Sequence, residues 1–189
     1  MALLGDILGG MKRVVEDGLA MRHDRVVLEN FPSVVQLDGY SCGAQCVDMV
    51  LRYELGLRVP LEELKQRCNT TVENGTEPED IINCLAHYGL HAESRFRHKG
   101  MKEAIRRQID AGHPVMAVVP SLRKGTEHWI VIYGYRTHDK QFLVRDPRVL
   151  YTRTDGIRVY LRIGGESRHG RKKKNIPELL DKQILSCWY

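Results

Sequence analysis

The sequence predicts an α+β protein in which helices come first and a mostly antiparallel sheet follows. Apolar residues keep three-to-four spacing up to about residue 111, whereas later segments are short runs of β-branched and aromatic residues. The chain has 189 residues, 42% of them hydrophobic, which suits one compact domain with short extensions. This composition excludes collagen-like, repeat-built and wholly disordered proteins.

The helices of the first half are predicted from apolar spacing and from residues that begin or end helices. An amphipathic helix is expected around 11–19. The next helix begins near Cys42 and ends at Gly56, because glycine readily closes a helix. The others are expected after Pro60 through Cys68, from a capping box at 76–79 to Gly89, and over 101–111.

The sheet is predicted from runs that polar loops separate. Strands are expected over 90–96, 114–119, 128–135 and 141–145, and a hairpin over 149–161 that Asp155 and Gly156 interrupt. A flexible basic loop is expected over 164–175. A last helix is predicted to follow it, because Leu179, Leu180, Ile184 and Leu185 fall on one helical face.

These elements divide the chain into a helical extension (1–30), a main domain (31–161), and a basic loop with a C-terminal helix (162–189). Residues 160–189 carry +4 of the net charge of +5, so the body of the protein is nearly neutral. The pI of 9.0 therefore does not by itself indicate a nucleic-acid-binding protein, and the basic run 171–174 is interpreted as a solvated loop.

Cysteine content and apolar runs predict a cytoplasmic protein. The five cysteines are an odd number without a Cys-x-x-Cys pair, which favours reduced thiols over a disulfide framework. No apolar run approaches the roughly 18 residues that a membrane span requires. The first ten residues have no basic region and include Asp6, so they are not typical of a signal peptide.

The strongest chemical signal is the segment from Gln36 to Ala44. A thiol at Cys42 would lie in the first turn of a helix, where the helix dipole and unpaired N–H groups favour the reactive thiolate. Gly43 leaves the approach to the sulfur open. The amide of Gln36, across a turn, could join the Cys42 N–H in an oxyanion hole.

A thiol nucleophile also needs a base, and His128 is the candidate. It begins one predicted strand, and Asp146 ends the next strand eighteen residues later. If the two strands pair as a hairpin, Asp146 lies beside the His128 ring and sets its tautomer while the other ring nitrogen faces Cys42. Asp38 and Asp139 are rival carboxylates, although both lie in turns where aspartate is common.

At this point the chain resembles the bacteriocin-processing, double-glycine-leader cysteine peptidases (cysteine peptidase family 39) and their stand-alone relatives. The resemblance covers roughly residues 31–150. The first thirty and last forty residues have no counterpart in that family, and no transporter domain follows. It rests on these segments: 36–44, 76–80, 111–115, 128–131 and 144–147.

The resemblance implies a papain-like cysteine peptidase fold and a triad of Cys42, His128 and Asp146, with Gln36 supporting the oxyanion. It implies a peptide or protein substrate, with a Gly-Gly cleavage site as the candidate, and no cofactor or metal. Three alternatives stay open: a transglutaminase, deamidase or acyltransferase with the same triad, an inactive peptide-binding module, and nucleic-acid docking by the basic tail.

Other motifs are interpreted as structural. Cys46, Cys68, Cys84 and Cys187 are expected to be core or surface residues. A zinc site at Cys84, His87 and His91 is disfavoured because Gly89 interrupts the helix and no fourth ligand has matching spacing. Ile7-Leu8-Gly9-Gly10 is similar to a double-glycine site, but a flexible terminus is the favoured interpretation, because Gly-Gly is common in such segments.

Overall fold

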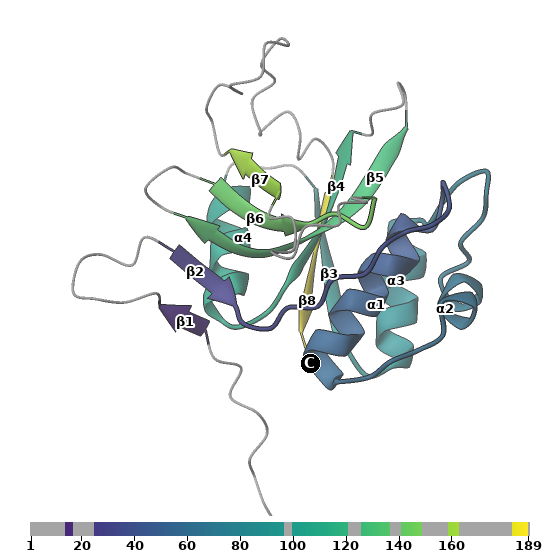
Figure 1. Ribbon diagram of the computed structural model, residues 1–189, viewed down its shortest axis with the longest axis horizontal. Coiled ribbons are helices and arrows are strands. Elements are labelled where there is room, and N and C mark those ends of the chain that lie inside the picture. Colours follow the sequence, from purple (N-terminus) through teal and green to yellow (C-terminus); the bar gives the residue numbers. More distant parts are fainter. Residues whose placement is uncertain are drawn as a thin grey trace, which may run out of the picture.

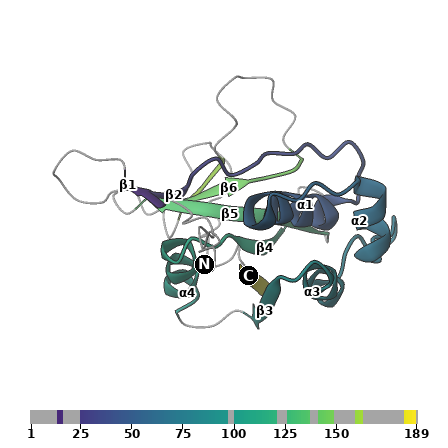
Figure 2. The ribbon, with the colours of Figure 1, turned by 90° about the horizontal axis from the view of Figure 1, so that it is seen from below.

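The protein is described by a computed structural model over residues 14–16, 25–96, 100–120, 126–136, 141–148, 159–162 and 183–188. Helices α1, α2 and α3 gather at one end of a twisted sheet, and α4 lies apart from them (Figures 1 and 2). Helix α1 packs on β5, α3 on β3, and α4 on β2, β4 and β5. The helices span Cys42–Leu55 (α1), Leu61–Arg67 (α2), Pro78–His87 (α3) and Met101–Asp110 (α4).

Helix α1 is the central helix and carries the candidate nucleophile at its first position. Ser41 is its N-cap residue. Gly56 ends it with φ at 66°, a left-handed conformation that glycine adopts without a Cβ clash. Most of its residues are buried, which fixes the position of its N-terminus against the sheet.

Over the described residues the sheet has eight strands, and every pairing among them is antiparallel. The strands are β1 (Val14–Glu16), β2 (Arg25–Leu28), β3 (His91–Phe96), β4 (Val115–Pro120), β5 (Glu127–Arg136), β6 (Gln141–Arg145), β7 (Val159–Arg162) and β8 (Gln183–Trp188). Their order is β1-β2-β5-β4-β8-β3, with β6 between β5 and β7. Helices packed on a mostly antiparallel sheet confirm the predicted α+β class.

Strand β5 is the strand around which the site is organised, because it pairs with β4 and β2 on one side and with β6 on the other. Its register with β6 shifts between Ile132 and Gly134. A Cβ on Gly134 would lie 2.6 Å from the carbonyl oxygen of Val26, so only glycine allows β2 to approach this closely. The first half of β5, which begins beside α1, is left to pair with β4.

Two predicted helices are wrong. The helix expected around 11–19 is replaced over Val14–Glu16 by strand β1, whose β-branched pair is typical of a strand. The predicted C-terminal helix is replaced over Gln183–Trp188 by strand β8, which lies between β4 and β3. Residues 184, 185 and 187 are all buried. A strand covered on both faces lacks alternation, so its apolar spacing imitates a helix.

The other predicted elements of the main domain are confirmed at nearly the expected positions. Strand β7 pairs with β6, while 149–158 of the predicted hairpin lie outside the described residues. The basic loop 164–175 also lies outside them. Both β2 and β8 belong to the same sheet as the strands of 31–161. The proposed division of the chain into three parts stays a prediction.

Candidate active site

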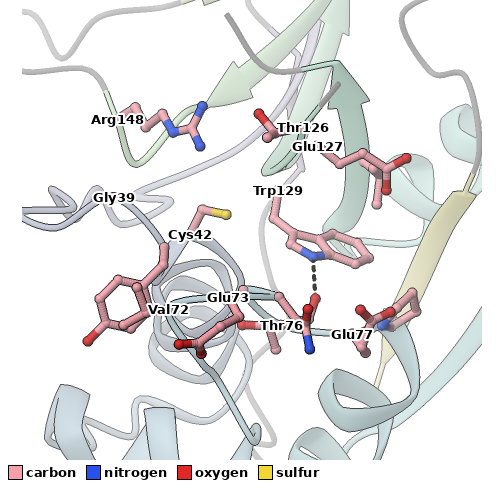
Figure 3. Close-up of a pocket in the computed structure, with 15 residues that line it drawn as sticks. Gly39, Cys42, Val72, Glu73, Thr76, Glu77, Thr126, Glu127, Trp129 and Arg148 are labelled. Carbon is pink, nitrogen blue, oxygen red and sulfur yellow. Dashed lines mark hydrogen bonds between the residues drawn. The ribbon is translucent and has the colours of Figure 1, made fainter. Parts of the chain in front are cut away.

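Cys42 lies at the N-terminus of α1 and lines a pocket of about 630 Å³ (Figure 3). Cys42 is only 5% exposed and borders this pocket. The opposite wall comes from Trp129 on β5, and Arg148 lies above the thiol in Figure 3. The predicted placement of the thiol in the first helical turn is confirmed.

His128 and Asp146 meet as the hairpin argument predicted. Strands β5 and β6 pair antiparallel up to Val131 and Arg145, so the residue after β6 returns beside the start of β5. The Nε2 atom of His128 lies 2.6 Å from Oδ1 of Asp146. The Nδ1 atom is buried and has no hydrogen-bond partner among the described residues. Asp146 therefore orients the ring and leaves Nδ1 free to serve another group.

The pKa values of the thiol and the imidazole move toward each other. Burial raises the pKa of Cys42, but the nearby His128 side chain, the backbone of Trp129 and the charge of Arg148 together outweigh burial and lower it below its ordinary value. Burial also lowers the pKa of His128, but the hydrogen bond to Asp146 and the nearby charges of Asp146 and Cys42 outweigh this and raise it. The arrangement favours a thiolate beside an imidazolium.

Asp146 stays ionised in this environment. Burial raises its pKa, but the hydrogen bond from His128 and the positive charge of the ring outweigh burial. The backbone N–H of Arg148 also donates to Oδ1 of Asp146 at 2.8 Å. The net pKa is lowered, so Asp146 keeps its negative charge at neutral pH and stabilises the imidazolium.

Gln36 is buried and is held at both its backbone and its side chain. Its backbone N–H donates to the carbonyl of Pro147 at 2.7 Å, which ties the segment before α1 to the turn after Asp146. Its Nε2 atom donates to Oδ1 of Asp38 at 3.2 Å. The rival carboxylate Asp38 thus contacts Gln36, whereas the imidazole of His128 bonds Asp146. The other rival, Asp139, lies outside the described residues.

Gly43 allows the loop before α3 to approach the nucleophile. A Cβ on Gly43 would lie 2.5 Å from the Cβ of Thr76, a separation that side chains do not tolerate. The indole Nε1 of Trp129 donates to the backbone carbonyl of Thr76 at 2.9 Å (Figure 3). This hydrogen bond joins the helical and sheet sides of the site. Thr76, Trp129 and Cys42 all line the pocket, so this hydrogen bond fixes part of its wall.

Sequence reasoning missed Thr76 and Trp129 as pocket residues. Thr76 was expected to cap α3, but Glu77 is the N-cap residue and the Thr76 hydroxyl lies 2.8 Å from that of Thr70. A signal for Trp129 existed, because it directly follows the candidate base. Its partner could not be found from the sequence, since the hydrogen bond joins residues 53 positions apart.

The remaining cysteines are structural, as expected: all four lack a disulfide and are buried. They are Cys46, Cys68, Cys84 and Cys187. The described ranges contain no group of three or more His, Cys, Asp or Glu side chains able to hold a metal ion. No described helix is both long and apolar enough to cross a membrane.

The fold is that of the papain-like cysteine peptidases, with helices packed against an antiparallel sheet. Residues 28–167 match the Peptidase_C39 like family, and the chain belongs to that family. The predicted resemblance is therefore confirmed. No curated protein matches the sequence.

Three solved structures share the fold. A double glycine motif protease from an AMS/PCAT transporter, in complex with the leader peptide, is 19% identical with a TM-score of 0.57, covering 82% of this chain and 89% of its own. The peptidase domain of Streptococcus ComA, a bi-functional ABC transporter, is 16% identical with a TM-score of 0.59, and the match covers 84% of this chain and 98% of that domain. A C39-like peptidase from Bacillus anthracis is 16% identical with a TM-score of 0.60, and the match covers 86% of this chain and 96% of that peptidase.

Proposed function

We propose that the protein is a cysteine peptidase that cleaves a peptide bond through Cys42, His128 and Asp146. The observation that carries this proposal is that the two nitrogens of the His128 ring have different surroundings. Its Nε2 is committed to Asp146 at 2.6 Å, and its buried Nδ1 has no hydrogen-bond partner among the described residues. The pKa of Cys42 is lowered with His128 among the causes, which supports the pairing of this thiol with this imidazole. Family membership gives independent support.

The reaction follows from these positions. The Cys42 thiolate attacks the carbonyl carbon of the scissile bond, and the negative charge moves to the carbonyl oxygen. The backbone N–H of Cys42 and the amide of Gln36 stabilise that oxyanion. The imidazolium of His128 gives its Nδ1 proton to the leaving amine and then takes a proton from the water that hydrolyses the thioester. Asp146 keeps the ring oriented throughout.

The proposed substrate is a peptide with glycine next to the scissile bond, and a Gly-Gly site is the specific candidate. Gly43 packs against Thr76, and Thr76 forms part of the pocket wall together with Cys42, so a substrate residue without a side chain avoids steric conflict with this wall. One structural neighbour is described as a double glycine motif protease in complex with the leader peptide. The five buried free thiols also suit a reduced compartment, and we propose that the protein acts in the cytoplasm.

The proposed function is tested with a library of peptides that carry a Gly-Gly pair at different positions along the sequence. Peptides with Ala-Ala or Ser-Ser in place of Gly-Gly are the matched controls, and the products are identified. Digestion runs in H₂¹⁸O and is read by mass spectrometry. We expect two fragments, with ¹⁸O in the new carboxyl group after glycine. Release of ammonia without chain cleavage would indicate a deamidase, and transfer to an added amine an acyltransferase. Binding of the peptides without formation of any product would contradict the proposal that the protein is an enzyme.

A further inference from the structure

Gln36 belongs to a small hydrogen-bonded cluster whose other members have no part in the chemistry above. Both its main chain and its side chain are anchored, the first to Pro147 and the second to Asp38. Its Oε1 atom is buried and has no hydrogen-bond partner among the described residues. The contact with Asp38 is therefore the described hydrogen bond that sets the orientation of the amide group.

A carboxylate is a selective partner for an amide, because it accepts hydrogen bonds and cannot donate them when ionised. It can bond the NH₂ end of Gln36 but repels the carbonyl end. Burial raises the pKa of Asp38, but hydrogen bonds from Ser41, Tyr40 and Gln36 outweigh it and lower the pKa to about 2. The group is therefore ionised, and an acceptor only, at neutral pH.

We infer that Asp38 is a positioning residue for the oxyanion hole, which fixes the Gln36 amide with one N–H on its own carboxylate and the second N–H facing the oxygen of the substrate. This inference rests on the proposed function. The NH₂ group of Gln36 has two hydrogens, and Asp38 occupies one of them at 3.2 Å. Without Asp38 the amide could rotate and present Oε1 to a developing negative charge, which would oppose catalysis.

A second task of Asp38 joins the oxyanion hole to the nucleophile. Its Oδ1 atom also accepts the backbone N–H of Tyr40 at 3.0 Å and of Ser41 at 2.8 Å. One oxygen atom thus holds both Gln36 and the turn that leads directly into Cys42. The two proposed donors to the oxyanion, the Gln36 amide and the Cys42 N–H, are thereby fixed relative to each other.

A negative charge near the oxyanion would be unfavourable if it were not balanced. Lys65 on α2 supplies the balance, because its Nζ lies 3.4 Å from Oδ2 of Asp38. The same ammonium group lies 5.0 Å from the centroid of the Tyr40 ring and 2.9 Å from Oε1 of Glu62. These contacts leave Oδ1 to the N–H donors and place the positive charge on the other side of the carboxylate.

The inference is tested by a double-mutant cycle with the preferred peptide of the library. Asp38→Ser keeps an oxygen that can accept the turn N–H groups but is too short and too weak to hold the amide. We expect Gln36→Ala to lower kcat by about 10²-fold. Asp38→Ser should lower kcat about tenfold with KM within about twofold. In the Gln36→Ala background the same change should cost less than about twofold.

Two further variants complete the test. Asp38→Asn should recover most of the activity, because its Oδ1 can accept the same three donors. Asp80→Ala is the matched control. Asp80 also accepts a side-chain hydrogen bond, from Asn69 at 2.6 Å, but it has no described hydrogen bond to Gln36. Thermal unfolding checks that each variant folds.

The possible failures are distinguishable. An equal loss from Asp38→Ser in both backgrounds would assign Asp38 to the fold and overturn the inference. If the wild type cleaves the peptide and Gln36→Ala keeps full activity, the inference would be overturned too, while the proposed peptidase function would stand. No cleavage by the wild type would instead contradict the proposed function.

Discussion

Replacing Cys42 by alanine is expected to abolish peptide cleavage while leaving the fold intact. Removal of a nucleophile from a catalytic triad lowers kcat by about 10⁴- to 10⁶-fold, because no other group can form the covalent intermediate. The side chain is small and borders a pocket, so the change leaves no closed cavity. The measurement is kcat/KM on the preferred Gly-Gly peptide, with thermal unfolding as a check of folding.

The matched control is Cys46→Ala, one turn further along α1. Cys46 is fully buried, and burial raises the pKa of its thiol well above the ordinary value, so it is not a nucleophile. We expect this variant to lose some stability and to keep its activity. Activity that survives in Cys42→Ala, or that disappears equally in both variants, would show that Cys42 is not the nucleophile.

Replacing Asp146 by asparagine is expected to lower kcat/KM by about 10²-fold and to change the pH dependence. General acid–base catalysis contributes about 10²- to 10⁴-fold, and it depends here on the tautomer and orientation of His128. An asparagine is nearly the same size, but its NH₂ group can face Nε2 and reverse the tautomer. Oδ1 of Asp146 accepts from both Nε2 of His128 and the Arg148 N–H, so an asparagine that turns its NH₂ group toward Nε2 also loses the hydrogen bond from Arg148, and thermal unfolding checks that the turn is kept.

The direction of the pH change follows from the pKa shifts. The reactive pair needs Cys42 ionised and His128 protonated, so activity rises with pH through the pKa of the thiol and falls through that of the imidazole. In the wild type the pKa of Cys42 is lowered and that of His128 is raised, which widens the active range on both sides. Without the Asp146 charge the pKa of His128 decreases, so the descending limb moves to lower pH.

The control for this experiment is Asp110→Asn on α4. Asp110 accepts a hydrogen bond from the hydroxyl of Tyr135 at 2.7 Å, at the far end of β5 from His128. We expect an unchanged pH profile in this variant. A profile for Asp146→Asn with both limbs in their wild-type positions would contradict a role for Asp146 in setting the pKa of His128.

The main residues of the site could be predicted because local rules place them. A helix that begins at Cys42 follows from apolar spacing and Gly56, and a hairpin between the strands that bear His128 and Asp146 follows from two short apolar runs with a polar loop. Antiparallel pairing then brings Asp146 beside His128 without further information. The contact of 2.6 Å between their side chains is the consequence.

The missed features depend on contacts between distant segments. Strand β8 comes from the end of the chain and is buried between β4 and β3, a position that removes the alternation by which strands are recognised. The sequence offers Asp38 as a turn residue and as a rival partner of His128, and nothing in its spacing shows that its carboxylate meets Gln36 instead. Thr76 and Trp129 meet because α3 and β5 pack on either side of α1, and tertiary packing of this kind leaves no periodic signal.

The most direct test is the rate at which Cys42 reacts with limiting iodoacetamide at about pH 6, mapped by peptide mass spectrometry in the wild type and in His128→Ala. An ordinary thiol, with a pKa of about 8.5, is barely ionised at that pH. A thiolate held by His128 predicts one fast adduct on Cys42 that slows markedly in the variant. Five equally slow thiols, or a Cys42 that reacts at the same rate without His128, would contradict an activated cysteine–histidine pair.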